Sequence, residues 1–566
     1  MGYFTTSQLF LFPSFDLDQN EQDKLDVLLA VLEESGIGKI IERCTSHDDS
    51  GGGRNGYDPY RLFATIAYSF SRHYSSLRDI QDGCRYDLRY IYLAHQQTPS
   101  YVTISSFINE VIVPNRDLIF GLFVKAMIRH FDIDVSDVFI DGTKLEANAN
   151  KYKFVFKSDK KRVKVSESAR CLLSRLKLPE GIPPDRILTS SFLARQVSAF
   201  SSKMMENGVS LNPIISGKGH SLTQEQKDYR KLCDLLEKTL NYEEIEEICG
   251  PERNSFYKTD HDATAMCLKE DYYSGVGSNM HSAYNVQICV SKGLIMNYLV
   301  TQDRNDLYTF VPVLKKYMKL YDEYPKRVCA DAGYGSKRNY SFLKDAGIMN
   351  YVKYTEWEGN TTGRRPSRYT ISANGDFICL NGKKGNCLGE EYKNRHKVQA
   401  YEVKGCRQCQ YRNYCKSRMK RKCDNRMMFY VDVESELFKQ EAKRNLLSPK
   451  GIEMRVNRSA QVEGAFGVIK QDMGYDQFRR RGLEKVETEF MLVSLGYNIA
   501  KLLRLAAGKG KFDYWIAPEN LVAEEFVEPR PKILGRKHKS KRSLNKEAQR
   551  LSKRNIGKEN AHFDNN

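Results

Sequence analysis

Apolar residues recur at helical spacing along the first 130 residues of the chain. Asp58 and Pro59 form a cap with a first-turn proline, and the apolar positions of Leu62–Phe70 then repeat every three or four residues. Ser76 followed by Asp79 is typical of a capping box that opens the next helix. The pattern therefore predicts an all-helical amino-terminal domain that ends near residue 130.

Three arginines accompany these expected helices. Arg78, Arg85 and Arg89 lie on the helix that follows Ser76 and on its continuation, and the last two are four residues apart, on one helix face. Short helices with several arginines are typical of helix-turn-helix-like DNA-binding units. A helical bundle with solvated arginines explains the same periodicity equally well.

The pattern changes from helix to strand at about residue 138. Val138–Ile140 is a short apolar run that ends in Asp141 and a glycine, which predicts a buried strand with a carboxylate at its end. Arg327–Ala330 is a second run of this kind and ends in Asp331. Neighbouring strands that end in this way place their carboxylates at one edge of a sheet.

Further strands and helices complete the expected core. The pattern predicts that residues 284–290 and 294–301 form a hairpin. It also predicts a helix from about Leu307 to Tyr321 and a last strand over residues 351–354. The order strand, insert, hairpin, helix, strand, helix, strand predicts an α/β core with a mixed sheet.

Two inserts and two long helices divide the rest of the chain. The polar, helical stretch 158–255 has an apolar face marked by Leu232, Leu235, Leu236 and Leu240, whereas 356–425 is rich in Gly, Cys and basic residues and has no clear period. Apolar stripes predict helices from about Ser459 and around Val486–Ala500. The expected divisions are a helical domain (1–130), core segments (131–157, 256–355), a helical insert (158–255), a Cys-rich insert (356–425), closing helices (426–510) and a basic tail (511–566).

The charge of the chain favours a polyanionic partner. The chain has 566 residues, of which 41% are hydrophobic and 28% charged, and its 89 Lys and Arg against 71 Asp and Glu give a net charge of +18. Residues 530–558 hold 12 Lys or Arg and one acid, which predicts a disordered tail that contacts phosphates. No apolar run approaches the roughly 20 residues of a spanning helix, so we expect a soluble protein inside the cell.

Glu463 is the third carboxylate that could join the two strand-end aspartates. It lies beside the apolar stripe of its helix, and Gly464 and Gly467 would let that helix approach the sheet closely. Three converging acids repel one another unless a cation neutralises them, and hard oxygen ligands favour Mg²⁺ or Mn²⁺. Taken singly, each acid is more typical of a turn or of a solvated surface position than of a site.

Three segments resemble the DDE transposases of bacterial insertion sequences, a family with an RNase H-like catalytic core. They are Phe139–Asn148, Ala330–Gly335 and Val462–Lys470. The similarity extends over roughly residues 10 to 505. Other similar segments, in the order of the family, are Tyr57–Ile80, Thr103–Phe107, Tyr284–Gln287 and Arg480–Leu502.

The resemblance implies roles for individual residues. Asp141, Asp331 and Glu463 become a metal-binding catalytic triad, and Lys470, seven residues after the glutamate, becomes a DNA contact. Related enzymes often have an arginine four residues before the glutamate, but this chain has Ser459 there and Arg458 one position earlier. In addition to the arginines of the helical domain, the expected DNA contacts include Arg458 and Lys144.

The resemblance also implies a reaction and its partners. Water attacks a phosphodiester at a transposon end, and the freed 3′-hydroxyl then attacks target DNA, with two divalent metal ions at the triad. The expected partner is double-stranded DNA, both the terminal inverted repeats and the target, bound by a homodimer or larger assembly in the bacterial cytoplasm, at the nucleoid. Two other functions remain open: a metal-dependent nuclease that does not join ends, and a transposase-derived DNA-binding protein without catalysis.

Six of the 14 cysteines lie between residues 379 and 423. Cys406-x₂-Cys409-x₅-Cys415, with Cys379 upstream, offers four thiolates that suit one structural Zn²⁺. Similar inserts occur between the second aspartate and the glutamate in the branch of the family that this chain most resembles. Reduced cysteines without metal are the alternative. The spare candidate ligands are Cys387, His396 and Cys423.

Overall fold

The computed structural model divides into two compact units. The core unit comprises Met1–Lys353 and Ser448–Ala523, and the cysteine unit comprises Tyr354–Leu447 and Glu524–Asn566. The basic segment 530–558 and Cys423 lie outside the described residues. The structure describes residues 17–45, 56–72, 76–178, 180–211, 222–251, 253–268, 280–362, 364–372, 374–393, 396–417 and 425–509.

The amino-terminal part of the core unit is helical, as the apolar periodicity predicts. The Asp58 side chain caps α3 by accepting hydrogen bonds from the backbone N–H groups of Tyr60 and Arg61, at 3.0 and 3.1 Å. The helices are α1 (Gln19–Glu34), α2 (Ile37–Thr45), α3 (Pro59–Phe70), α4 (Leu77–Tyr86), α5 (Leu88–Leu93), α6 (Tyr101–Phe107), the π turn η1 (Ile108–Ile112) and α7 (Val113–Phe131).

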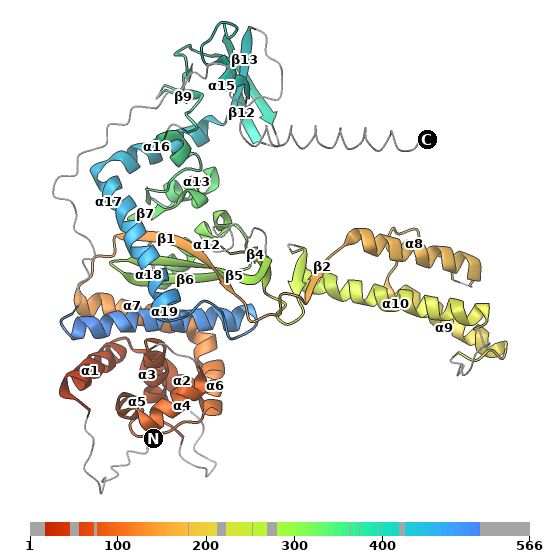
Figure 1. The fold of residues 1–566 in the computed structure, drawn as a ribbon, viewed down its shortest axis with the longest axis horizontal. Coiled ribbons are helices and arrows are strands. Elements are labelled where there is room, and N and C mark those ends of the chain that lie inside the picture. Colours follow the sequence, from red (N-terminus) through yellow and green to blue (C-terminus); the bar gives the residue numbers. More distant parts are fainter. Residues whose placement is uncertain are drawn as a thin grey trace, which may run out of the picture. The chain divides into compact units, whose positions relative to one another are not determined.

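One mixed sheet forms the centre of the core unit (Figure 1). β5 runs antiparallel to β1, β4 and β6, whereas β1, β7 and β8 are parallel, and the order is β4-β5-β1-β7-β8 with β6 also paired to β5. The expected hairpin is β5 and β6. The strands are β1 (Asp137–Glu146), β4 (Thr264–Cys267), β5 (Met280–Ser291), β6 (Leu294–Thr301), β7 (Arg327–Ala330) and β8 (Met349–Asn350).

Strand β1 does not end at Asp141, as the sequence suggested, but continues to Glu146. Its parallel pairing with β7 stops with Ile140 opposite Ala330, whereas its antiparallel pairing with β5 continues to Glu146 opposite Ala283. Asp141 therefore lies inside a ten-residue strand, one position beyond the end of the β7 pairing.

The last expected strand, 351–354, is shorter and earlier than predicted. Regular pairing covers only Met349–Asn350, although the N–H groups of Tyr351 and Lys353 still donate to Val328 and Ala330 of β7, at 2.9 and 3.2 Å.

Helices on the sheet position the last part of the chain. The helix expected from Ser459 begins ten residues earlier, at Pro449, because the Ser448 hydroxyl caps it by accepting from Gly451 N–H at 3.0 Å. α17 and η4 pack against β1. The elements are η2 (Asp306–Tyr308), α12 (Phe310–Tyr321), η3 (Ala332–Tyr334), α13 (Lys337–Asp345), α17 (Pro449–Arg458), the π turn η4 (Ser459–Glu463), α18 (Gly464–Gly467), the π turn η5 (Val468–Asp472) and α19 (Leu483–Ala506).

Helix α19 joins the sheet to the amino-terminal helices and lies beside α7 (Figure 1). Its Asn498 amide donates to Ile295 O and accepts from Ile295 N–H of β6, both at 2.9 Å. A Cβ at Gly496 would lie 2.4 Å from the backbone of Phe70 in α3, so only glycine permits this approach.

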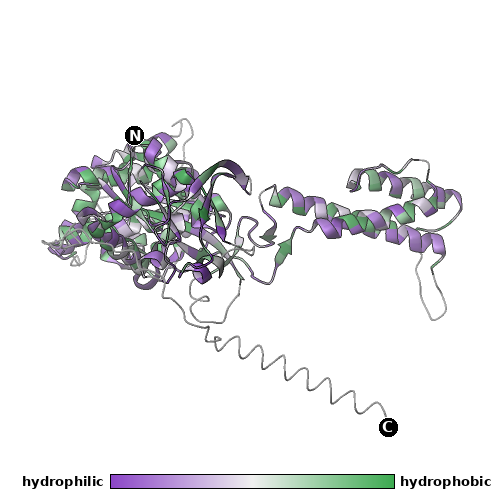
Figure 2. Ribbon diagram, turned by 90° about the horizontal axis from the view of Figure 1, so that it is seen from above, coloured by the Kyte–Doolittle hydropathy of each residue, from purple (hydrophilic) through white to green (hydrophobic). Residues whose placement is uncertain are grey.

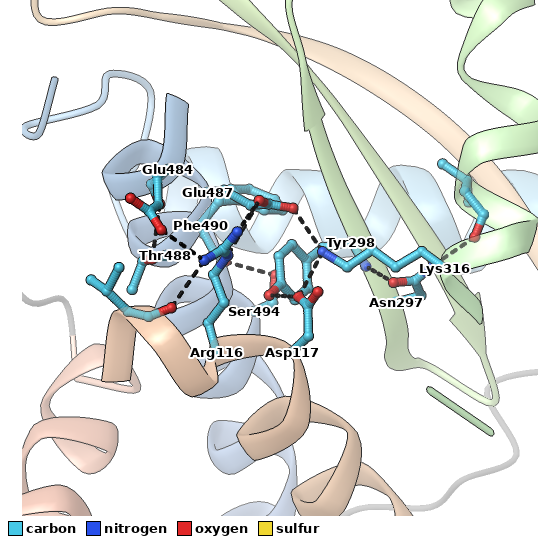
Figure 3. A network of polar contacts seen from close by, with 12 residues as sticks. Arg116, Asp117, Asn297, Tyr298, Lys316, Glu484, Glu487, Thr488, Phe490 and Ser494 are labelled. Carbon is cyan, nitrogen blue, oxygen red and sulfur yellow. Dashed lines mark hydrogen bonds and ion pairs between the residues drawn. The ribbon is translucent and has the colours of Figure 1, made fainter. Parts of the chain in front are cut away.

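A polar network connects four of these elements (Figure 3). Asp117 of α7 accepts from the Tyr298 hydroxyl of β6 at 2.8 Å and pairs with Lys316 of α12 at 2.9 Å. Lys316 also pairs with Glu487 of α19 at 2.7 Å, and Glu487 pairs with Arg116 of α7 at 3.1 Å. The network ties the helical domain to the sheet and to α19.

The predicted helical arm is present and has its own core. A two-stranded ribbon of β2 and β3 leads into three helices whose mixed hydrophilic and hydrophobic residues fit one buried face (Figures 1 and 2). Leu232 and Leu235 are buried in it, but Leu240 is 51% exposed and is wrongly assigned to the apolar face. The elements are β2 (Phe154–Phe156), α8 (Asp159–Leu176), α9 (Ser190–Glu206), α10 (Gln224–Cys249) and β3 (Ser255–Tyr257).

The cysteine unit contains small antiparallel sheets around stacked aromatic rings. Phe377 stacks against Tyr369 and Tyr401, with ring centroids 5.0 and 4.9 Å apart. The unit extends to Leu447 instead of the expected 425, because β13 pairs with β12. Its elements are α14 (Trp357–Thr361), β9 (Tyr369–Ile371), β10 (Phe377–Cys379), β11 (Asn386–Lys393), β12 (His396–Lys404), α15 (Arg412–Ser417), β13 (Arg426–Val431) and α16 (Val433–Leu447).

The described helices include none that combines the length and the apolar character needed to cross a membrane.

Candidate active site

One guanidinium brings the three predicted acids together. Arg458 Nη2 lies 2.7 Å from Asp141 Oδ2 and 3.8 Å from Asp331 Oδ2, and Arg458 Nη1 lies 3.8 Å from Glu463 Oε1. The acids come from the middle of β1, from the residue after β7 and from the end of η4, segments far apart in the sequence. They therefore converge at one place on the sheet.

The π turn η4 explains the unexpected position of the arginine. In an α-helix, residues four apart lie one above another, whereas a π turn closes its hydrogen bonds from i to i+5. Because Ser459–Glu463 forms a π turn, Arg458 and Glu463, five residues apart, come onto one helix face. The π turn therefore compensates for the one additional residue between Arg458 and Glu463, compared with the spacing of four in related enzymes.

The three acids differ in their exposure to solvent. The Asp141 side chain is only 12% exposed and accepts a hydrogen bond from Gly142 N–H at 2.9 Å. The side chains of Asp331 and Glu463 are 46% and 61% exposed, and Asp331 accepts from Ala332 N–H at 2.8 Å. One acid is therefore fixed in the sheet, and the other two face solvent, where a substrate can reach them.

The electrostatics of the site favour positive charge. Burial alone would lower the pKa of Arg458, but the neighbouring carboxylates, Asp141 first, outweigh it and raise this pKa above its ordinary value. Among the described residues, no three or more His, Cys, Asp or Glu side chains form a group that could hold a metal ion. Each of the three acids instead lies within 4 Å of the Arg458 guanidinium.

A buried network around the Gln287 amide packs against the residues next to both aspartates. A Cβ at Gly142 would lie 2.1 Å from Gln287 Nε2, so the absence of a side chain there makes room for the Gln287 amide. Gln287 Nε2 donates to Asp306 Oδ1 at 3.0 Å and to Asn285 Oδ1 at 2.9 Å, and the Tyr334 hydroxyl donates to Gln287 Oε1. The network links β1, β5, η2 and η3.

The network reaches both aspartates through their neighbours in the chain. Gly142 directly follows Asp141, and Tyr334 lies in the turn that the Asp331 side chain caps. Sequence reasoning missed this role, although Gln287 lies in a segment that resembles the family. Sequence reasoning also missed Lys353, whose Nζ lies 4.0 Å from Asp331 Oδ1. Lys353 reaches this position because its N–H group donates to Ala330 of β7.

The three basic residues expected near the triad differ in where the structure places them. Arg458 is 8% exposed, and its guanidinium lies beside the acids. Lys144 is three positions from Asp141 on β1 and therefore points to the opposite face of the sheet. Lys470 is half-buried in the π turn η5, and Glu463 ends the π turn η4, so the simple two-turn relation expected of a continuous α-helix does not hold.

The three arginines of the amino-terminal domain do not share one helix face. Asp87 ends α4 and caps α5, where it accepts from Arg89 N–H at 2.9 Å, so Arg85 and Arg89 lie on different helices. Arg89 is also held by the Asp87 carboxylate at 2.6 Å. Arg78, over the Tyr101 ring at 4.7 Å, and Arg85 are exposed.

Three cysteines of the cysteine unit lie within electrostatic range of a fourth, Cys415. Burial, together with the thiols of Cys409, Cys379 and Cys406, raises the pKa of Cys415 to about 11, although Arg368 opposes the shift. Cys379, Cys406 and Cys415 also belong to one core cluster. The other spare ligands, Cys387 and His396, are exposed in β11 and β12.

Comparison with protein families identifies two segments of the chain. Residues 14–110 match the Transposase domain (DUF772), and residues 378–503 match the Transposase DDE domain. Both matches support a DDE transposase of an insertion sequence. The comparisons with curated proteins and with solved structures gave no match.

The two matches cover different parts of the chain. The first spans most of the amino-terminal helices, and the second runs from the cysteine unit through Arg458, Glu463 and Lys470 into α19. Asp141 and Asp331 lie outside both matched segments. Their place in the site depends on the geometry around Arg458.

Proposed function

We propose that this chain acts as a DDE transposase, which cleaves DNA at transposon ends and joins the freed 3′ ends to target DNA, with Asp141, Asp331 and Glu463 as its catalytic acids. The observation that carries the proposal is the convergence of all three carboxylates within 4 Å of one guanidinium. The mixed sheet and its helices fit an RNase H-like core, which belongs to the same proposal.

The acids have the donor chemistry for Mg²⁺ or Mn²⁺, because carboxylate oxygens are the ligands that these cations prefer. Bound at Asp141, Asp331 and Glu463, a pair of such ions would stabilise the attacking and leaving oxygens of phosphoryl transfer. Arg458 offsets part of the repulsion among the acids, and a planar guanidinium is also suited to a phosphate. The exposed sides of Asp331 and Glu463 leave room for DNA.

The partner in this proposal is double-stranded DNA, bound by phosphate contacts from basic residues. Arg78 and Arg85 are exposed on the helical domain and are proposed contacts there, and Lys470 of η5 is a further proposed contact. Two transposon ends must meet for joining, so a dimer or larger assembly is part of the proposal.

The direct test is cleavage of linear DNA that carries the ends of the element. With Mg²⁺, the purified chain is expected to nick at the end and to leave a 3′-hydroxyl, and omission of divalent metal is expected to stop the reaction. Persistent absence of metal-dependent cleavage with Mg²⁺ and with Mn²⁺ would contradict the proposed activity.

Replacement of Gln287 by leucine is expected to slow cleavage about 10- to 100-fold, the usual effect of losing an outer partner of a metal site. The amide that links β1 to the turn after Asp331 would be lost, so the metal concentration for half-maximal rate should rise. Asn297→Leu is the matched control, because Asn297 is a buried amide of the same sheet that donates instead to Val313 O. Equal metal dependence in the two variants would contradict a positioning role for Gln287.

We propose that Cys379, Cys406, Cys409 and Cys415 hold one structural Zn²⁺. The thiols suit this ion, and the effect of the other three thiols on the pKa of Cys415 supports a common site.

Chains purified without chelator are expected to contain about one zinc, and the joint replacement of Cys406 and Cys409 by serine is expected to remove it. Zinc binding is coupled to local folding, so protease resistance of the cysteine unit should fall with the metal. Cys44 and Cys171 are exposed cysteines elsewhere, and their replacement by serine is the control. Zinc well below half a mole per mole of wild-type chain would show that these thiols are free.

A further inference from the structure

The ribbon at the base of the helical arm exposes large aromatic side chains. Tyr152, just before β2, is 84% exposed, and Phe154 and Phe156, on one face of β2, are 42% and 60% exposed. Phe154 packs on Tyr257 of β3, with ring centroids 5.3 Å apart. Phenylalanine and tyrosine are ordinarily buried for most of their area, so three exposed rings within five residues call for a partner.

A groove runs along the same ribbon. It has a volume of about 460 Å³ and lies between β2, β3 and the last turns of α10. Its floor includes the buried residues Ile245 and Phe256. Its rim includes the exposed residues Lys161, Lys258 and His261 and one exposed acid, Glu244. The groove therefore has an apolar, aromatic floor and a largely basic rim.

The chain around the ribbon is strongly basic. Residues 151–164 contain seven Lys or Arg and one acid, a surplus of six positive charges. Lys157 and Arg162 pair with Glu246 of α10, but five other lysines of this stretch are exposed. The exposed lysines are Lys151, Lys153, Lys160, Lys161 and Lys164.

We propose that this ribbon groove binds unpaired bases of DNA. Exposed aromatic rings stack on bases, and a basic groove follows the phosphate backbone, which together are the features of sites for single strands. Bases inside a duplex are already stacked, so the aromatic rings favour a strand that has left its partner. The surplus of positive charge favours a polyanionic partner over an apolar surface of another protein.

The position of the ribbon in the chain suits this role. β1, which carries Asp141, ends at Glu146, and β2 begins at Phe154, so eight residue steps join them. Such a connection spans at most roughly 30 Å. The proposal rests on the DNA substrate of the proposed function, and it adds a second binding site that holds a separated strand.

Binding to two probes, without added divalent metal, tests the proposal on the full chain. The probes are a fluorescent 12-nucleotide oligothymidine and a 12-base-pair duplex. In the variant with Tyr152→Ala and Phe156→Ala, affinity for oligothymidine is expected to fall at least tenfold, since each stacked base is worth about five- to a hundredfold. Affinity for the duplex is expected to stay within twofold.

Tyr392→Ala is the matched control, because Tyr392 is a tyrosine of similar exposure, 76%, on β11 of the cysteine unit. Unchanged binding to oligothymidine, or an equal loss on both probes, would overturn the proposal. A change in the sedimentation mass of the aromatic variant with unchanged oligothymidine binding would assign the surface to a second copy of the chain instead. Cleavage plays no part in these measurements, so their failure is distinct from failure of the proposed catalysis.

Discussion

Replacement of Asp331 by asparagine is expected to reduce DNA cleavage at least about a thousandfold, a loss of roughly 4 kcal/mol of transition-state stabilisation. Asparagine keeps the shape of the side chain but removes the charge that would hold a divalent cation. Asp141→Asn and Glu463→Gln are expected to have the same effect. DNA affinity should change little, because it comes mainly from phosphate contacts by Lys and Arg.

The rate of nicking in Mg²⁺ and the affinity for end DNA, measured on the same preparations, check this expectation. Asp322→Asn is the control, because this aspartate is 86% exposed and pairs only at the surface, with Lys125. Full nicking activity in any one of the three variants would remove that residue from the proposed triad.

Replacement of Lys316 by methionine is expected to lower the free energy of unfolding by about 2–3 kcal/mol, because it leaves two partly buried carboxylates without this cation. Burial acts to raise the pKa of Asp117, but the charge and hydrogen bond of Lys316 outweigh it and hold this pKa below its ordinary value. Without Lys316, only the Tyr298 hydroxyl and the charge of Arg116 still offset the burial cost of the Asp117 charge. Glu487 keeps Arg116 as a partner (Figure 3).

Denaturant unfolding followed by circular dichroism measures this effect. Lys125→Met is the matched control: its partner Asp322 is exposed, so a loss of at most about 1 kcal/mol is expected. Adding Asp117→Asn to Lys316→Met should recover part of the lost stability, because a neutral amide costs less to bury. A loss below about 1 kcal/mol for Lys316→Met would show that the network contributes little to stability.

Local signals in the sequence predict local structure well in this protein. Asp58 caps α3, and the hairpin turn after Ser291 is formed at Lys292 and Gly293, which have positive φ angles of 49° and 73°. Both features depend on a few neighbouring residues, so the sequence contains all that determines them.

Features that depend on partners elsewhere in the chain were missed. The pairing with β5 carries β1 past Asp141, and the sequence of β1 alone does not contain this information. The π turn before Glu463 likewise has no local signal, so Arg458 read as a displaced residue although it contacts all three acids.

Polar networks show the same limit. The partners of Lys316 come from α7, β6 and α19, and those of Gln287 from β5, η2 and η3. Sequence periodicity identifies buried apolar faces, but it does not state which distant polar groups meet in them.

Strand transfer with a pre-cleaved end tests the central claim most directly, because it separates a transposase from a nuclease on the same acids. A duplex with a recessed or blunt transposon end and a free 3′-hydroxyl is mixed with the chain, Mg²⁺ and supercoiled target DNA. The proposed function predicts covalent joining of the labelled end to the target, and no joining with Asp141→Asn. Metal-dependent cutting of the target without any joined product would contradict the transposase reaction and leave a nuclease.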